Sequence, residues 1–207
     1  MHIDPTSNTS EHNYKLLTNL VVPRPIAWIT SLGPHGLVNL APFSFFNAVG
    51  SDPVCVLVSI GRRDSGAPKD TARNILDRGE FVVNMVTEEL LEAMNISAVA
   101  FPPDQSELTA AHLHTAAALR VHTPRLAEAQ VSLECRLAHT QVLGANTLLI
   151  GEVVMFHVAD RLLGPRQHVQ DFAPIGRLGS PSVYCRTTER FELAPISHAQ
   201  WLAQHPT

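Results

Sequence analysis

The tripeptide Lys69-Asp-Thr71 stands where a helix is predicted to begin. The first turn of a helix presents unpaired backbone N–H groups and the positive end of the helix dipole, and the Lys69 ammonium would add a charge beside them. This combination favours the binding of a phosphate group. An ordinary capped helix at the surface is the alternative interpretation, and the spacing is compatible with both.

A second unusual segment runs over residues 22–31 and is followed by Asn39-Leu-Ala-Pro-Phe-Ser-Phe-Phe-Asn47. Thr30 and Ser31 offer two hydroxyls at the end of a predicted strand. We expect Pro42 to break the second segment and to leave backbone N–H and C=O groups outside the hydrogen-bond ladder. Such groups beside aromatic rings suit a flat heterocycle with a polar edge. The alternative is a hairpin with a proline-bulged edge.

Motifs for a nucleotide-binding loop, a side-chain nucleophile or a metal are otherwise absent. Gly176-Arg-Leu-Gly179 keeps only two glycines of the dinucleotide-binding fingerprint, and no P-loop, G-x-S-x-G or H-E-x-x-H occurs. The chain has 11 histidines, among them His112 and His114, which would point to different faces of a helix but could share one face of a strand. Because no acid or cysteine stands at ligand spacing beside them, we expect no metal site.

Strand patterns dominate the segments that must position these residues. The run 54–60 is continuously apolar and predicts a strand buried on both faces, whereas 131–137 alternates with period 2. The turn at Gly144-Ala-Asn146 makes 147–158 the antiparallel partner of that alternating strand. The predicted strands are 26–31, 37–41, 54–60, 81–86, 131–137 and 147–158.

Helices are predicted to be few and short. Asp70 could cap 71–78, Thr87 could cap 88–97, and Ser197 could cap 198–204. A further short helix begins near Asp104 and Glu107. Residues 162–181 form a long loop rich in Pro and Gly, which is typical of a functional loop or a partner contact. Strands in hairpin order with inserted helices predict one mainly β domain, a Greek-key barrel.

The composition excludes several classes of protein. Charged residues make up 16% of the 207 residues, and the net charge is −4. This is a globular composition without the basic excess of a nucleic-acid binder, and no apolar run reaches the ~20 residues that span a bilayer. A charge content below the usual value of about 25% fits a surface partly hidden in a homo-oligomer, or compositional drift of the source genome.

The cysteines and the N-terminus predict a cytoplasmic protein. Cys55, Cys135 and Cys185 are widely spaced and form no C-x-x-C pair, which indicates reduced thiols rather than disulfides or a zinc site. Residues 1–13 are polar and lack the basic and apolar regions of a secretory signal.

With these segments in view, the sequence resembles the flavin reductase-like family with the FMN-binding split barrel. The resemblance covers about residues 14–193 and rests on three motifs in order: Pro23-Arg-Pro-Ile-Ala-Trp-Ile-Thr-Ser31, then Asn39-Leu-Ala-Pro-Phe-Ser-Phe-Phe-Asn47 with Ser51-Asp-Pro53, then Lys69-Asp-Thr-Ala-Arg-Asn74. It implies a polar arm at 1–13, a split-barrel domain at 14–193 and a C-terminal helix and tail at 194–207. It also implies a homodimer that binds FMN near its interface.

The resemblance further implies roles for individual residues. Thr30 and Ser31 would contact the flavin phosphate or ribityl chain, and Lys69 and Thr71 would bind the phosphate. The other implied flavin contacts are Asn39, Ala41 and Ser44 at the ring edge, Ser59 and Gly61 on the other side of the ring, and Asn47 and Arg24. Arg24 could instead form a structural ion pair.

One departure from the family concerns the substrate side. The family often carries Arg-x-Gly-Gly and then Tyr, whereas this chain reads Arg177-Leu-Gly-Ser-Pro-Ser-Val-Tyr184. The implied activity is electron transfer between NAD(P)H and the flavin or a redox partner such as an oxygenase, and the cofactor would do this chemistry without a catalytic side chain. The alternatives are a flavin-binding electron carrier that does not use a nicotinamide, and a barrel that binds without catalysis.

Overall fold

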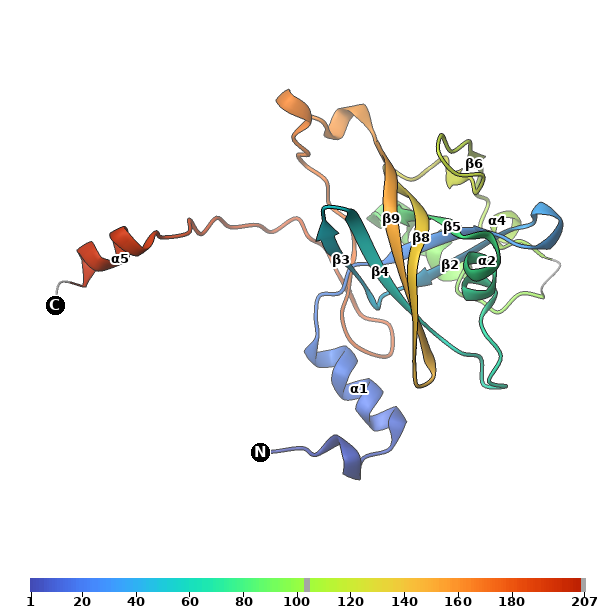
Figure 1. The fold of residues 1–207 in the computed structure, drawn as a ribbon, viewed down its shortest axis with the longest axis horizontal. Coiled ribbons are helices and arrows are strands. Elements are labelled where there is room, and N and C mark those ends of the chain that lie inside the picture. Colours follow the sequence, from blue (N-terminus) through green and yellow to red (C-terminus); the bar gives the residue numbers. More distant parts are fainter. Residues whose placement is uncertain (103–104, 206–207) are drawn as a thin grey trace.

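The computed structural model describes residues 1–102 and 105–205. A seven-stranded antiparallel sheet dominates it, with the strand order β2-β1-β5-β8-β9-β4-β3 (Figure 1). Its strands are β1 (Ala27–Leu32), β2 (Val38–Phe43), β3 (Phe46–Ser51), β4 (Val54–Gly61), β5 (Glu80–Met85), β8 (Val131–Leu143) and β9 (Asn146–Val158). Two small pairs join β6 (Thr115–Ala116) to β7 (Arg125–Leu126) and β10 (Gly176–Arg177) to β11 (Tyr184–Cys185).

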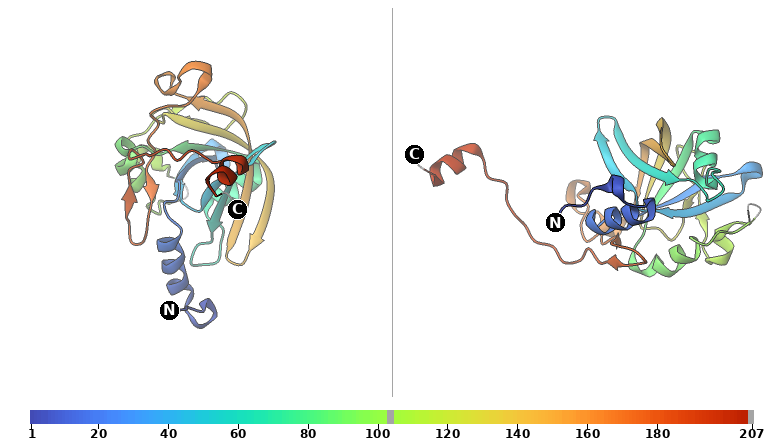
Figure 2. Two further views of the ribbon diagram at one scale, coloured as in Figure 1. Left: turned by 90° about the vertical axis from the view of Figure 1, so that its left-hand side faces the viewer. Right: turned by 90° about the horizontal axis from the view of Figure 1, so that it is seen from below.

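The sheet curls until its two edges meet. β2 and β3 are opposite edges in the strand order, yet only Ser44 and Phe45 separate them in the chain. Across this junction the N–H of Ser59 on β4 donates to the carbonyl of Phe45 over 2.8 Å. We call residues 42–45 the seam. The curled sheet, seen in Figure 2, confirms the predicted mainly β Greek-key barrel with inserted helices.

The strand predictions need three corrections, and the first two concern β2 and β3. Pro42 does not break the segment that contains it, because it lies within β2 and pairs opposite Trp28. β2 is an edge strand, where the missing N–H of proline needs no partner. β3 was not predicted, because all of its residues after Phe46 are exposed and the strand therefore lacks an alternating pattern of apolar residues on a buried face.

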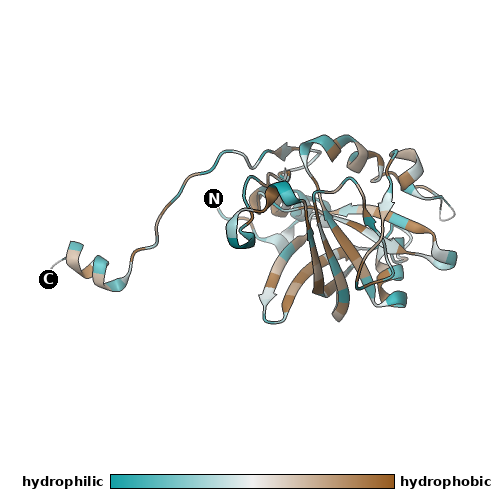
Figure 3. Ribbon diagram, turned by 90° about the horizontal axis from the view of Figure 1, so that it is seen from above, coloured by the Kyte–Doolittle hydropathy of each residue, from teal (hydrophilic) through white to brown (hydrophobic). Residues whose placement is uncertain are grey.

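Burial on both faces falls on β1 rather than on 54–60. Ala27 and Ile29 belong to the core inside the barrel, while Trp28 packs on the outside with Met94 and Leu126. β4 instead alternates, with Leu57 and Ser59 only half-buried. Residues that follow β5 in the chain, among them Met94 and Leu126, pack over the outer face of β1 and bury it. Figure 3 shows the apolar residues along the strands.

The helices are α1 (Ser10–Leu20), α2 (Asp70–Arg78), α3 (Leu91–Ile96), α4 (Glu107–Ala110) and α5 (His198–Gln204), with 3-10 turns at Pro5–Ser7, Pro34–Gly36, Glu88–Leu90, Asp160–Leu162 and Pro165–Gln167. α1 was not predicted and crosses the expected arm boundary at residue 13. The predicted cap at Ser197 is confirmed by a capping box. Ser106 caps α4, and the expected start at Asp104 lies outside the described residues. After Arg190, whose guanidinium still donates to the carbonyl of Phe172, the chain extends away from the barrel to α5 (Figure 1).

Candidate functional site

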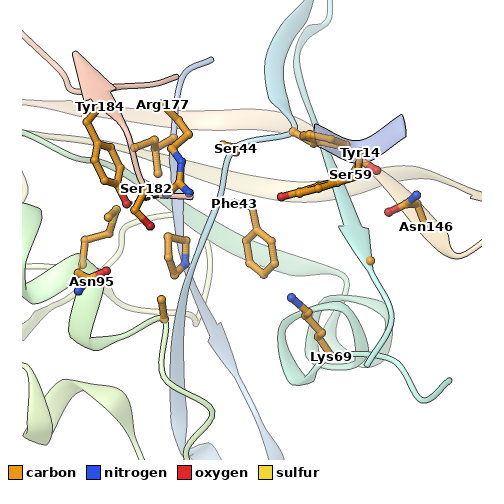
Figure 4. A pocket seen from close by; sticks show the side chains of 16 residues that line it. Tyr14, Phe43, Ser44, Ser59, Lys69, Asn95, Asn146, Arg177, Ser182 and Tyr184 are labelled. Carbon is orange, nitrogen blue, oxygen red and sulfur yellow. Dashed lines mark hydrogen bonds between the residues drawn. The ribbon is translucent and has the colours of Figure 1, made fainter. Parts of the chain in front are cut away.

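A cavity of about 430 Å³ opens at the seam, within the usual range for small-molecule sites of about 300–1,000 Å³. Figure 4 shows its side chains. Phe43 and Ser44 come from the seam, Ser59 and Gly61 from β4, and Lys69 from the residue before α2. α1, α3, the β8–β9 turn and the β10–β11 segment close the remaining sides with Tyr14, Asn95, Asn146, Arg177, Ser182 and Tyr184. We call this the seam cavity.

A second cavity of about 270 Å³ adjoins the first. The two share the wall residues Pro42, Phe43, Lys69 and Ala98. Asn39, Ala41 and Thr71 line the second cavity only. The buried Glu107 also borders it, and its Oε2 accepts the N–H of Leu40 over 2.9 Å. Burial raises the pKa of Glu107 above its ordinary value, although the hydrogen bond from Leu40 opposes this shift.

The N-terminus of α2 lies where the cavities meet. Lys69, not Asp70 as predicted, is the N-cap residue, and its side chain makes no capping hydrogen bond. Asp70 is the first helical residue, and its carboxylate forms ion pairs with Arg63 and Arg73. The first-turn N–H groups of α2 therefore lack a side-chain cap. The Lys69 Nζ lies 5.8 Å from the centroid of the Phe43 ring.

Seven of the eleven predicted site residues line one or both cavities: Asn39, Ala41, Ser44, Ser59, Gly61, Lys69 and Thr71. They come from three separate segments of the chain. Asn39 and Thr71 also touch each other, since Asn39 Nδ2 donates to Thr71 Oγ1 over 2.9 Å. The first turn of α2 and the edge strand β2 are thus joined by two of the predicted residues.

Thr30 and Ser31 are fully buried and line neither cavity. Thr30 Oγ1 donates to the carbonyl of Pro124 over 2.7 Å, and Ser31 Oγ accepts from Asn74 Nδ2 at 3.2 Å. Since β1 is covered on both faces, each hydroxyl forms its hydrogen bond to another group inside the protein. The structure therefore does not place these two residues where a ligand in either cavity would reach their side chains.

Arg24 and Asn47 also lie outside both cavities. The buried Arg24 forms no ion pair among the described residues. Its Nη1 donates to the carbonyls of Thr18 and Val21, and its Nη2 donates to the carbonyl of Leu178 over 2.7 Å. It thus ties the end of α1 to the β10–β11 segment. Asn47 is exposed on β3, where its Oδ1 accepts the N–H of Ala48.

Several residues of the seam cavity are not among the site residues predicted from the sequence. Tyr14 and Asn95 come from α1 and α3, and no motif marks them. Asn146 stands in a turn that was predicted, but only the β4–β9 pairing brings it opposite Gly61. Arg177 and Tyr184 belong to the segment that departs from the family pattern, and their side chains meet through a 2.7 Å hydrogen bond from Arg177 Nη1 to the Tyr184 hydroxyl.

Residues 19–191 match the family model of the flavin reductase like domain. The chain belongs to this family. Component B of nitrilotriacetate monooxygenase from Bacillus cereus is 38% identical with a TM-score of 0.89, covering 93% of this chain and 98% of its own. The 2-nitrobenzoate 2-nitroreductase NbaA of Pseudomonas fluorescens is 34% identical with a TM-score of 0.86, covering 96% and 98%.

A structure from Shewanella frigidimarina shares the split-barrel fold of the family. Its TM-score is 0.79 at 20% identity, and the similarity covers 95% of this chain and 100% of that chain. The resemblance found from the motifs is therefore confirmed. Membership in the family and the two closer similarities support a flavin-related oxidoreductase. Within residues 1–102 and 105–205, no helix is long and apolar enough to cross a membrane, and no three His, Cys, Asp or Glu side chains cluster as metal ligands.

Proposed function

We propose that this protein binds FMN across the two adjoining cavities. The uncapped first turn of α2 and the Lys69 ammonium would hold the phosphate, because both supply positive charge and free N–H donors at the junction of the cavities. Thr71 supports this assignment. Its Oγ1 already accepts a hydrogen bond from Asn39, which leaves its own O–H to donate to a phosphate oxygen.

The seam cavity suits the flavin ring. Phe43 and Tyr14 supply aromatic surface, and Ser44 and Ser59 supply polar groups beside it. Ser44, the seam residue that follows β2, lies outside the β1–β2 pairing, so that its backbone N–H and C=O groups are near the cavity. A flat heterocycle with a polar edge needs this mixture of surfaces.

We further propose that the protein is an oxidoreductase in which NAD(P)H reduces the bound flavin. The cofactor, when bound, supplies the electron-transfer chemistry, while the chain binds it, orients it and limits access of water. The lining of the seam cavity supports this division of roles, because it includes no His, Cys, Asp or Glu among the described residues. Among the described residues, this lining thus offers no carboxylate, imidazole or thiol as a general base or nucleophile.

The visible spectrum of the purified protein tests the proposal. We expect flavin absorbance, either as isolated or after FMN is added and free flavin is removed, and bleaching of that absorbance when NADH or NADPH is mixed in under anaerobic stopped-flow conditions. Protein that stays colourless after reconstitution would overturn FMN binding. Bound flavin that neither nucleotide bleaches would refute nicotinamide use and leave an electron carrier that serves a redox partner.

We further propose a homodimer in the cytoplasm that passes electrons to an oxygenase. The exposed apolar side chains of the C-terminal segment support a covered surface in solution: Phe191, Leu193, Ile196, Trp201 and Leu202. The three free cysteines fit a reducing compartment. The similarity to a monooxygenase component supports the oxygenase. Sedimentation at the monomer mass would overturn the dimer.

A further inference from the structure

The two cations of the seam cavity lie at different ends of it. Lys69 also lines the second cavity, whereas Arg177 lines the seam cavity alone. In the view of Figure 4, the Phe43 ring lies between the two side chains. If Lys69 holds the flavin phosphate, Arg177 remains as a separate positive charge at the far end.

The Arg177 guanidinium is held in place by neutral groups. Its Nη1 donates to the hydroxyl of Tyr184 and its Nη2 to the carbonyl of Pro181, each over 2.7 Å. Its Cζ lies 4.7 Å from the centroid of the Tyr184 ring. Two reciprocal backbone hydrogen bonds of 2.8 Å to Arg24 fix the main chain. Arg177 is thus positioned by the protein's own groups.

The positive charge of Arg177 has no carboxylate partner within the described residues. The two hydrogen bonds use two of its five N–H donors, and three are left. The buried Arg24 pairs with Arg177 through the backbone, and the Arg177 charge adds to burial in lowering the pKa of Arg24. This end of the cavity therefore carries uncompensated positive charge that an anion would neutralise.

The remaining wall at this end is apolar and amide-bearing. Ile26, Met94 and the Tyr184 ring supply apolar surface, and the exposed Asn95 amide can donate or accept a hydrogen bond. A planar molecule with one negative group could therefore contact both this apolar wall and the Arg177 guanidinium. A fixed guanidinium matches the two oxygens of a carboxylate or phosphate.

We propose that Arg177, with Asn95 from the lining of the same cavity, forms an anion-binding subsite for the second reactant of the flavin site, an electron donor or acceptor that carries a carboxylate or phosphate group. The assignment of this ligand as a reactant rests on the proposed flavin function. The subsite itself rests on the geometry of Arg177. It makes Arg177 a determinant of specificity rather than a residue that takes part in electron transfer.

Ser182 allows a sharp test, because its Oγ and Arg177 Nη2 both donate to the Pro181 carbonyl oxygen at 2.7 Å. The substitution Ser182→Asp places a carboxylate beside Arg177 without removing any contact of the guanidinium, and Ser182→Asn is its uncharged match. Ser182 is exposed, so we expect both variants to fold. Arg177→Gln and Arg177→Lys provide the complementary pair.

The probes are benzoate, its neutral analogue benzamide, and inorganic phosphate, titrated by calorimetry into protein with and without FMN. We expect the wild type and S182N to bind benzoate or phosphate, and to prefer benzoate over benzamide by about tenfold or more, as for loss of a charge-assisted hydrogen bond. S182D and R177Q should lose this preference, and R177K should recover part of it.

Binding of benzoate alone identifies a carboxylate ligand, and binding of phosphate alone identifies a phosphorylated one. The proposal is overturned if the wild type binds neither anion, or if S182D retains the full preference. Failure of FMN to bind would refute the proposed function alone, because the calorimetry without FMN still measures the subsite.

Discussion

Asn39 Nδ2 donates to Thr71 Oγ1 across 2.9 Å and so joins the edge strand β2 to the first turn of α2. The two residues are far apart in the sequence, and each borders the second cavity. Because Asn39 uses the lone pair and not the hydrogen of the Thr71 hydroxyl, this contact orients Thr71 as a donor. The proposed phosphate site is therefore held by the barrel edge as well as by the helix.

Replacing Thr71 with Val should weaken both the fold and FMN binding. Thr71 is buried, and the isosteric change leaves the Asn39 amide without its acceptor, which costs about 1–2 kcal/mol of unfolding free energy. Urea unfolding and FMN titration measure the two effects. Thr71→Ser keeps the hydroxyl and serves as the control, so equal FMN affinity in T71V and T71S would remove Thr71 from the phosphate site.

Replacing Lys69 with Ala should weaken FMN binding by about 1–3 kcal/mol, the range for losing a charge-assisted hydrogen bond. Riboflavin binding should change far less, because riboflavin carries no phosphate. Lys15→Ala is the matched control, since Lys15 is exposed and pairs with Glu11 on α1. Equal losses for FMN and riboflavin would show that Lys69 does not contact the phosphate.

The buried Glu134 should make stability depend on pH in the acid range. Burial alone would raise its pKa, but hydrogen bonds from His157 and from the N–H groups of Leu119 and Arg120 outweigh burial and hold the pKa below its ordinary value of 4.5. A carboxyl whose pKa is lowered by folding stabilises the protein above the unfolded-state pKa. This contribution is fully present above pH 4.5 and is lost as the pH falls through the lower folded-state value.

Urea unfolding between pH 7 and pH 3 measures this dependence. Glu134→Gln should lose about 1–3 kcal/mol of unfolding free energy at pH 7. Its unfolding free energy should also fall less steeply than that of the wild type as the pH is lowered. Glu192→Gln, in the exposed C-terminal segment, should leave the wild-type profile unchanged. An equally steep fall in E134Q and the wild type would contradict the assignment.

Gly151 on β9 should not tolerate a side chain. A Cβ at this position would lie 2.5 Å from Cζ of Phe81 and 3.0 Å from Cβ of Cys135, inside the packed barrel. We expect Gly151→Ala to cost about 1–3 kcal/mol of unfolding free energy through overpacking. Phe81→Leu removes the clashing ring atom, so the double variant should be more stable than the sum of the two single losses predicts. Strict additivity would show that the Phe81 contact is not the cause.

Local patterns were sufficient for six of the seven strands of the main sheet and for part of the site. The alternation in 131–137 predicts β8 because a strand repeats every two residues, and Lys69-Asp-Thr71 indicates a helix start with a nearby cation. These are properties of neighbouring residues, so the sequence carries them directly. The motifs likewise identified the family, which residues 19–191 then matched.

Only the tertiary structure decided which of these residues line the two cavities. Thr30 and Ser31 carry hydroxyls that could bind a phosphate or ribityl chain. Because β1 is covered on both faces, these hydroxyls form hydrogen bonds to other groups of the protein instead. Arg177 stood out only as part of a departure from the family pattern, and it lies in the seam cavity because β10 is tied back to Arg24. The seam arises from the strand order, since the two edges of one sheet meet where only two residues of the chain separate β2 from β3. Such long-range pairings depend on the whole barrel, so no local pattern records them.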